Sequence, residues 1–181
     1  MKGIIFTEFL EMVEDQFSAD MVDDIILMSD LPSNGAYTSL GTYDYQEMVQ
    51  LVVGLSQQTG IAVSDLIQSF GSYLFARFVV IYPQFIAPHA TTISLLQNIE
   101  GYIHQEVLKL YPQAQLPHFD CEMPRPGCLI MTYQSIRPFA DLAHGLIRGC
   151  INHFNEPITL LKEDLSDGAG TAARFTITLT D

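Results

Sequence analysis

The stretch that decides how this chain is interpreted is Tyr133-Gln134-Ser135-Ile136-Arg137. In an extended chain, residues two apart share a face, so Tyr133, Ser135 and Arg137 project together. Pro138 follows, and it biases Arg137 away from the helical region. A phenol, an alcohol and a forked guanidinium in one row suit a ligand that carries two neighbouring carboxylates or phosphates. A polar strand face turned to solvent has the same spacing, so the row alone leaves both interpretations open.

A second feature, His104, precedes this row and lies beside an apolar stripe of helical spacing. The stripe predicts a continuous helix that Pro112 ends, and it consists of Leu96, Ile99, Ile103, Val107 and Leu110. Gly101 lies one turn before His104, where glycine costs about 1 kcal/mol relative to alanine. We interpret that glycine as room for a broad, flat ligand. A core histidine with both nitrogens hydrogen-bonded fits the same pattern.

Hydrophobic periodicity and turn residues divide the rest of the chain into helices and short strands. Helices are expected over 4–17, 18–28, 44–59, 64–82 and 139–154, the last led by Pro138. Extended runs are expected over 118–123, 128–135, 157–163 and 172–179, the first two as a hairpin. We therefore predict a single α+β domain over 1–181, a mainly helical body with a small four-stranded antiparallel sheet near the C-terminus.

Composition and charge narrow the class of partner. The 181 residues are 48% hydrophobic and carry a formal net charge of −13, which repels nucleic-acid backbones and anionic membranes. The most apolar run, 73–86, is too short to span a bilayer, and no signal peptide is visible. Cys121, Cys128 and Cys150 are an odd number, which argues against a disulfide framework. We predict a cytoplasmic protein without nucleic-acid or membrane partners.

The combination of the His104 helix, Pro117 and the Tyr-x-Ser-x-Arg row resembles the haem nitric oxide/oxygen-binding (H-NOX) domains. That family includes the haem domain of soluble guanylate cyclase and stand-alone bacterial relatives, and the resemblance covers the whole chain. It implies one haem b whose iron is bound by His104, a common type of haem ligand. It also implies that Tyr133, Ser135 and Arg137 hold the haem propionates and that Pro117 presses on the porphyrin.

The resemblance also indicates which gas would bind. Five residues beyond the motif arginine, oxygen-binding members have a tyrosine that holds the bound oxygen, whereas this chain has Leu142. The other distal residues that the resemblance implies are apolar, namely Ile5, Phe9, Phe78 and Leu146. Such a pocket favours nitric oxide and carbon monoxide over oxygen. Tyr73 and Tyr82 keep an oxygen-binding sensor open as an alternative, because either side chain is a possible donor.

For signalling, the resemblance implies a distal helical part over roughly 1–62 and a proximal part with the sheet over roughly 63–181. These parts would shift when nitric oxide breaks the bond between iron and His104. Gly71 and Gly145 are candidate hinges, and close helix packing explains them equally well. The sequence shows no catalytic triad, carboxylate dyad or phosphate-binding loop, so we expect no enzymatic activity. The signal would pass to a separate protein, which the resemblance suggests is a histidine kinase or a cyclic-di-GMP enzyme.

A thiol or zinc redox sensor is the alternative from another class. Its soft ligands would come from His118, Cys121, Cys128, Cys150 and His153, of which the last two share a helical face. No tight Cys-x-x-Cys pair supports it. A haem peroxidase would need a distal acid–base pair, which the expected apolar distal residues do not supply.

Overall fold

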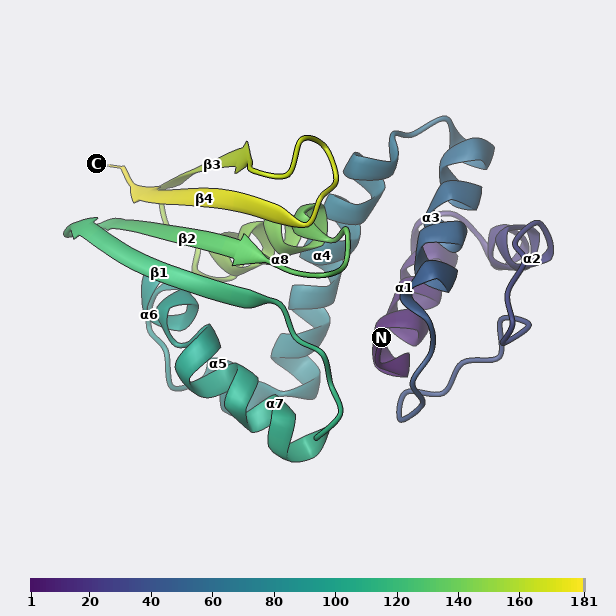
Figure 1. Cartoon of the computed structure of the whole chain (residues 1–181), viewed down its shortest axis with the longest axis horizontal. Helices are drawn as coiled ribbons and strands as arrows, with labels where there is room; N and C mark the ends of the chain where they lie inside the picture. Colours follow the sequence, from purple (N-terminus) through teal and green to yellow (C-terminus); the bar gives the residue numbers. More distant parts are fainter. Residues whose placement is uncertain (181) are drawn as a thin grey trace.

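Three helices form one end of the molecule and a four-stranded sheet lies at the other, with a long helix between them (Figure 1). The structure is a computed structural model that describes residues 1–180. The first end consists of α1 (Gly3–Gln16), α2 (Ala19–Leu27) and α3 (Tyr45–Thr59), and the long helix is α4 (Val63–Ile81). Residues 28–44 connect α2 to α3 through turns, and Thr42 forms an isolated β-bridge with Lys2.

Capping residues account for where these helices begin and end. The hydroxyl of Ser18 accepts a hydrogen bond from the Met21 amide at 3.1 Å, so Ser18 caps α2. Asp44 caps α3 in the same way, with its carboxylate 2.9 Å from the Gln46 amide. Gly60 ends α3 with a φ of 74°, a left-handed conformation that glycine adopts without strain. These boundaries agree with the predicted ones.

The segment that carries His104 differs from the continuous helix that the apolar stripe predicts. It consists of α5 (Pro83–Ile86), α6 (Thr92–Gln97), the π-helix η1 (Ile99–Ile103) and α7 (His104–Leu110). The Ile103 amide donates to the Asn98 carbonyl at 3.0 Å, a bond across five residues rather than four. The stripe does not reveal this change because its side chains stay on the inner side of the segment. The short helix α5 was not predicted.

The sheet has the strand order β1-β2-β4-β3, and every neighbouring pair is antiparallel. Its strands are β1 (His118–Arg125), β2 (Cys128–Gln134), β3 (Ile158–Asp164) and β4 (Ala172–Leu179). Buried and exposed residues alternate along β4, with Phe175 and Ile177 on the covered face. The helix α8 (Ala140–Phe154) packs on this face and on α4. The predicted α+β fold with a four-stranded antiparallel sheet is confirmed.

The join between β2 and α8 corrects two predicted boundaries. The strand ends at Gln134, so Ser135 and Arg137 lie beyond it. The helix begins at Ala140 rather than just after Pro138, because a tight turn precedes it. In that turn the Phe139 amide donates to the Arg137 carbonyl at 2.9 Å, and the Ala140 amide donates to Gly170 at 3.0 Å.

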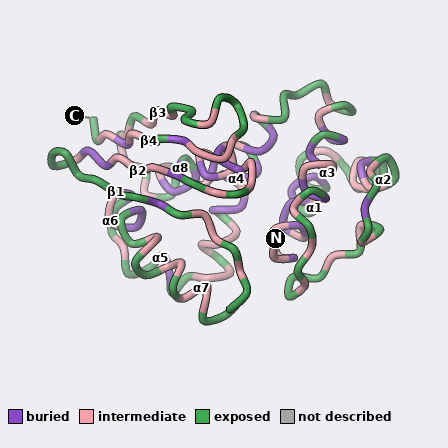
Figure 2. Tube along the Cα trace, viewed as in Figure 1, coloured by how far each residue is buried: buried purple, intermediate pink, exposed green. Residues whose placement is uncertain are grey.

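Buried residues form two clusters, and α4 contributes to both. Figure 2 marks the buried stretches along the chain. Phe70 of α4 belongs to the cluster of the helical end, whereas Phe75 belongs to the cluster beneath the sheet. At the crossing of α4 and α8, a Cβ on Gly71 would lie 2.5 Å from the Leu142 carbonyl oxygen, and one on Gly145 would overlap the Gln68 carbonyl. Close packing therefore explains both glycines, and a hinge at either stays a prediction. Within residues 1–180, no helix is both long and apolar enough to cross a membrane.

Candidate functional site

A cavity of about 630 Å³ lies between the helical end and the sheet-containing end. Volumes of this size are typical of pockets that enclose a small organic ligand. Its lining comes from both the helical end and the sheet-containing end of the molecule: Ile5 of α1 and Tyr43 before α3 on one side, and His104 and Val107 of α7 on the other. The lining is mainly apolar, and the polar groups described below lie at particular points on it.

His104 lines this cavity at the first residue of α7, where the π-helix gives way to the α-helix. Its Nδ1 atom lies 3.1 Å from Glu100 Oε2, and among residues 1–180 its Nε2 atom has no hydrogen-bond partner. Burial lowers the pKa of His104, and the Glu100 carboxylate opposes this shift only partly. The imidazole is therefore neutral near pH 7. A proton on Nδ1 leaves the Nε2 lone pair free to bind a metal.

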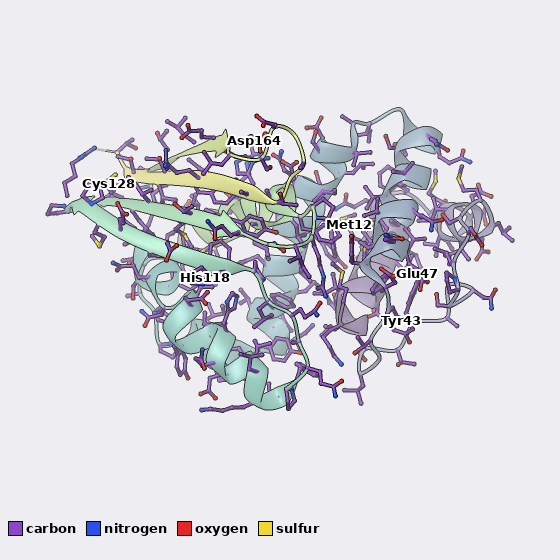
Figure 3. All side chains as sticks on the ribbon, viewed as in Figure 1. Met12, Tyr43, Glu47, His118, Cys128 and Asp164 are labelled. Carbon is purple, nitrogen blue, oxygen red and sulfur yellow. The ribbon has the colours of Figure 1, made fainter. Side chains whose placement is uncertain are left out.

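Glu100, on η1, uses both carboxylate oxygens. Oε2 accepts a hydrogen bond from the Phe119 amide at 3.2 Å as well as contacting His104, and Oε1 lies 3.0 Å from Nδ1 of His118. Figure 3 shows His118 at β1. Burial raises the pKa of Glu100, but the hydrogen bonds from His118 and the Phe119 amide outweigh it, so the pKa lies below its usual range. The carboxylate is therefore ionised at neutral pH.

The predicted donor row reaches the cavity even though the strand ends before it. Tyr133, Ser135 and Arg137 all line the cavity, and the Ser135 hydroxyl accepts a hydrogen bond from the Arg137 amide at 3.0 Å. The Arg137 guanidinium donates to the side chain of Gln115 at 2.8 Å and lies 5.8 Å from the Tyr45 ring centroid. Its Nε atom is buried without a hydrogen-bond partner among residues 1–180. Such an unpaired donor is costly unless a ligand accepts from it.

Four of the five predicted distal residues line the same cavity as His104. They are Ile5 of α1, Phe78 of α4, and Leu142 and Leu146 of α8. The fifth, Phe9, is absent from the lining and lies fully buried in the helical core, with its ring centroid 5.2 Å from that of Phe70. Phe9 lies outside this cavity because α4 packs on α1 at that turn. Pro117, between α7 and β1, lines the cavity as expected.

Comparisons with known proteins assign this arrangement to a family. The sequence profile described as Haem-NO-binding matches residues 2–161. The chain belongs to the haem-NO-binding (H-NOX) family. An unliganded Fe(II) H-NOX protein from K. algicida is 40% identical, with a TM-score of 0.94 over 100% of this chain and 97% of that chain. No curated protein sequence matches the chain.

Two further H-NOX structures extend the comparison. An H-NOX from Shewanella woodyi, solved in the Fe(II)CO state with IWP-051 bound, is 38% identical, with a TM-score of 0.84 over 99% of this chain and 95% of that chain. An H-NOX protein from S. oneidensis in the Fe(II)NO state is 25% identical, with a TM-score of 0.92 over 100% of both chains. The H-NOX fold is thus confirmed, and the family consists of haem-based gas sensors rather than enzymes.

The residues of this H-NOX cavity fit a haem. A haem presents an iron, a flat apolar ring and two carboxylates. His104 offers a neutral nitrogen with its other ring nitrogen held by a carboxylate, the usual arrangement of a metal-binding histidine. Arg137 offers a guanidinium with one buried unpaired nitrogen, which suits a carboxylate. The apolar lining between them suits the ring.

Tyr73 and Tyr82, the two possible hydrogen-bond donors to oxygen, differ in position. The Tyr73 hydroxyl donates to Asp15 at 3.0 Å at the surface, and Tyr73 does not line the cavity. Tyr82 does line it, and its hydroxyl lies 3.4 Å from that of Tyr111. Burial raises the pKa of Tyr82 above its usual range, so the hydroxyl keeps its proton. Its partner Tyr111 lies just beyond α7, on the side of the cavity that carries His104.

Several residues that line the cavity are not predicted from the sequence. Tyr43, Tyr45, Tyr111 and Gln115 lie in or beside loops, where no periodic pattern indicates which way a side chain points. Glu100 was recognisable, since it lies four residues before His104 on the same predicted helix. Gly101 was misinterpreted: it is exposed, and a Cβ there would meet no atom within 4 Å, so it makes no room in the cavity.

The ligands of the zinc alternative are dispersed. Cys121 is exposed on β1, whereas Cys128 on β2 and Cys150 on α8 are buried. Burial raises the pKa of the Cys150 thiol to about 12, which disfavours the thiolate that binds zinc. Within residues 1–180, no group of three or more His, Cys, Asp or Glu side chains is placed to hold a metal ion.

Proposed function

We propose that this chain is a nitric oxide sensor that binds one haem b through His104. The observation that carries the proposal is that one cavity is lined both by a histidine whose Nδ1 contacts Glu100 and by the apolar side chains around Leu142. Bound haem supplies a ferrous iron that takes up diatomic gases. His104 would hold the iron through Nε2, while Tyr133, Ser135 and Arg137 hold the propionates and Pro117 contacts the ring.

Selectivity for nitric oxide and carbon monoxide over oxygen follows from the distal side chains. Oxygen bound to ferrous haem carries partial negative charge and needs a hydrogen-bond donor, whereas nitric oxide does not. Ile5, Phe78, Leu142 and Leu146 are hydrocarbon side chains and offer none. The related S. oneidensis and S. woodyi proteins were solved in Fe(II)NO and Fe(II)CO states, respectively. These observations favour nitric oxide over the oxygen-binding alternative.

Signalling is proposed to follow from release of His104 when nitric oxide occupies the opposite side. His104 begins α7, which follows directly on η1, and η1 contacts β1. Release of His104 would therefore free α7. The distal part, roughly 1–62, and the proximal part, roughly 63–181, would then shift relative to each other, with Gly71 of α4 and Gly145 of α8 as candidate hinges. A separate protein in the cytoplasm, a histidine kinase or a cyclic-di-GMP enzyme, would receive the signal.

The proposal is tested by absorption spectroscopy of the reduced, haem-loaded protein. We expect one haem per chain, a change on adding nitric oxide or carbon monoxide, and no lasting change under oxygen. A protein purified and reconstituted without a Soret band would contradict haem binding. A stable spectrum specific to oxygen would contradict the selectivity and favour the alternative sensor.

A further inference from the structure

Glu100 is placed to act on the proposed iron ligand and on the sheet at once. We propose that Glu100 is a positioning residue that orients His104 and transmits a displacement of His104 to strand β1. This inference rests on the proposed function, because it takes His104 as the residue that binds and leaves the iron. It assigns a role to a side chain outside the donor row and outside the distal wall.

The contacts of Glu100 join three elements. Its carboxylate lies on η1, one oxygen reaches His104 on α7, and both oxygens reach β1 through the Phe119 amide and the His118 ring. The distances are 3.1, 3.2 and 3.0 Å, respectively. His118 is fixed a second time by Asp120, 3.2 Å from its Nε2. A carboxylate with three partners has little freedom to move independently of them.

The bond to His104 determines what that imidazole can do. An ionised carboxylate at Nδ1 holds the proton there and fixes the ring orientation, because charge-assisted hydrogen bonds are stronger than neutral ones. It also makes Nε2 more basic, as carboxylates behind metal-binding histidines do. Glu106, two residues after His104 on α7, is paired with Lys109 and has no such contact with His104.

The backbone between Glu100 and His104 is a π-helix rather than a regular α-helix. Residues Ile99–Ile103 form a π-helix, and such single turns are frequent at functional sites. The regular α-helical ladder is therefore interrupted immediately before His104. The His104 amide donates to the Ile99 carbonyl, a bond across five residues, and the contact with Glu100 adds a direct side-chain connection from His104 to β1.

The connection continues from β1 toward the donor row. Phe119, whose backbone amide donates a hydrogen bond to Glu100, is buried. Its ring centroid lies 6.0 Å from that of His104 and 5.5 Å from that of Tyr133. Phe119 and Tyr133 are also direct cross-strand partners in the register of β1 and β2. A change at His104 thus reaches the row that would hold the propionates through two contacts.

The positioning role is tested on the haem-loaded full chain with E100Q, E100A and the control E106Q. In resonance Raman spectra of the reduced protein, we expect the iron–histidine stretch to fall in E100Q, where the charge is lost, and further in E100A. Haem affinity should fall by about 10- to 100-fold in E100A, as is usual for outer-shell partners. E106Q should match the wild type. An unchanged stretch in both Glu100 variants would overturn the inference.

Transmission to the sheet is tested by NMR on ¹⁵N-labelled protein in the diamagnetic Fe(II)CO state and by amide hydrogen exchange with and without nitric oxide. We expect a proton on His104 Nδ1, and a nitric oxide-dependent change in exchange of the Phe119 amide that E100Q reduces. E100Q keeps the size and the acceptor oxygen, so it should fold even where E100A does not. An equal response of Phe119 in E100Q and wild type would overturn the transmission.

These outcomes separate the inference from the proposed function. If all variants load haem through His104 and the Glu100 variants behave like E106Q, the inference fails and the sensor proposal stands. If the wild type shows no iron–histidine stretch at all, His104 is not the ligand, and the proposed function fails first.

Discussion

The wall of the cavity around His104 and the wall around Leu142 are built from different chemistry. On the first wall, hydrogen bonds join His104 to Glu100 and Glu100 to β1. On the second wall, the side chains of Ile5, Phe78, Leu142 and Leu146 present only hydrocarbon. A binding group needs partners that fix its geometry, whereas selectivity against oxygen needs only the absence of a donor. Substitutions on the first wall should therefore change whether haem is held, and substitutions on the second should change which gas binds.

The largest effect is expected from H104G on the first wall. The variant should lose more haem affinity than the about 10- to 100-fold typical of an outer-shell partner, because it loses the ligand itself. Added imidazole should restore binding. Haem titration followed by absorption measures both effects. The control is H153A, which removes an exposed histidine on α8. A wild-type spectrum in H104G would identify another ligand.

The next largest effect is expected from R137A. Hydrogen bonds to charged groups contribute about 1.5–3 kcal/mol, which corresponds to about 10- to 100-fold in haem affinity. R148A removes an exposed arginine outside the cavity and should leave affinity unchanged. Equal affinities for R137A and R148A would show that Arg137 keeps its bond to Gln115 when haem is present.

The crossing of α4 and α8, the two helices that carry Phe78, Leu142 and Leu146 of the second wall, is probed by G145A. A Cβ there overlaps the Gln68 carbonyl, so we expect destabilisation by about 1–3 kcal/mol in denaturant unfolding. G101A is the matched control: its Cβ meets open space, and it should stabilise by up to about 1 kcal/mol. If G145A were as stable as the wild type while nitric oxide signalling was lost, Gly145 would act as a hinge rather than a packing residue.

The smallest effect is expected on the second wall, from L142Y. A phenol there supplies a donor toward the gas, worth about 0.5–1.5 kcal/mol. Oxygen should then dissociate about 2- to 10-fold more slowly in stopped-flow measurements. L142F, with the same ring and no hydroxyl, should behave like the wild type. A similar gain in L142F would assign the effect to the shape of the pocket.

The elements of the fold follow from local signals to a large extent. The helices expected over 18–28 and 44–59 match α2 and α3, which Ser18, Asp44 and Gly60 cap, and the extended run expected over 172–179 is β4. The continuous helix over the His104 stripe was wrong, because a π-turn changes the backbone hydrogen bonds without displacing the apolar positions. A hydrophobic pattern indicates which side chains face inward, but it does not show how the backbone between them is hydrogen-bonded.

The same distinction applies to the residues of the site. His104 and the donor row lie at the cavity, but the row was expected on a strand that in fact ends at Gln134. Phe9 shares a helical face with Ile5, yet only Ile5 reaches the cavity, because Phe9 packs against Phe70 of α4. The sequence of α1 alone does not indicate where another helix will pack on it. Gln115, which binds Arg137, lies in a loop whose path no local rule determines.

The central claim is that His104 is held for binding and is released by nitric oxide. Electron paramagnetic resonance of the reduced protein with nitric oxide tests it directly, with histidine in natural abundance and labelled with ¹⁵N. The account predicts identical spectra, because no histidine nitrogen remains on the iron. A change of hyperfine pattern on labelling would show that His104 stays bound, and it would contradict release as the signal.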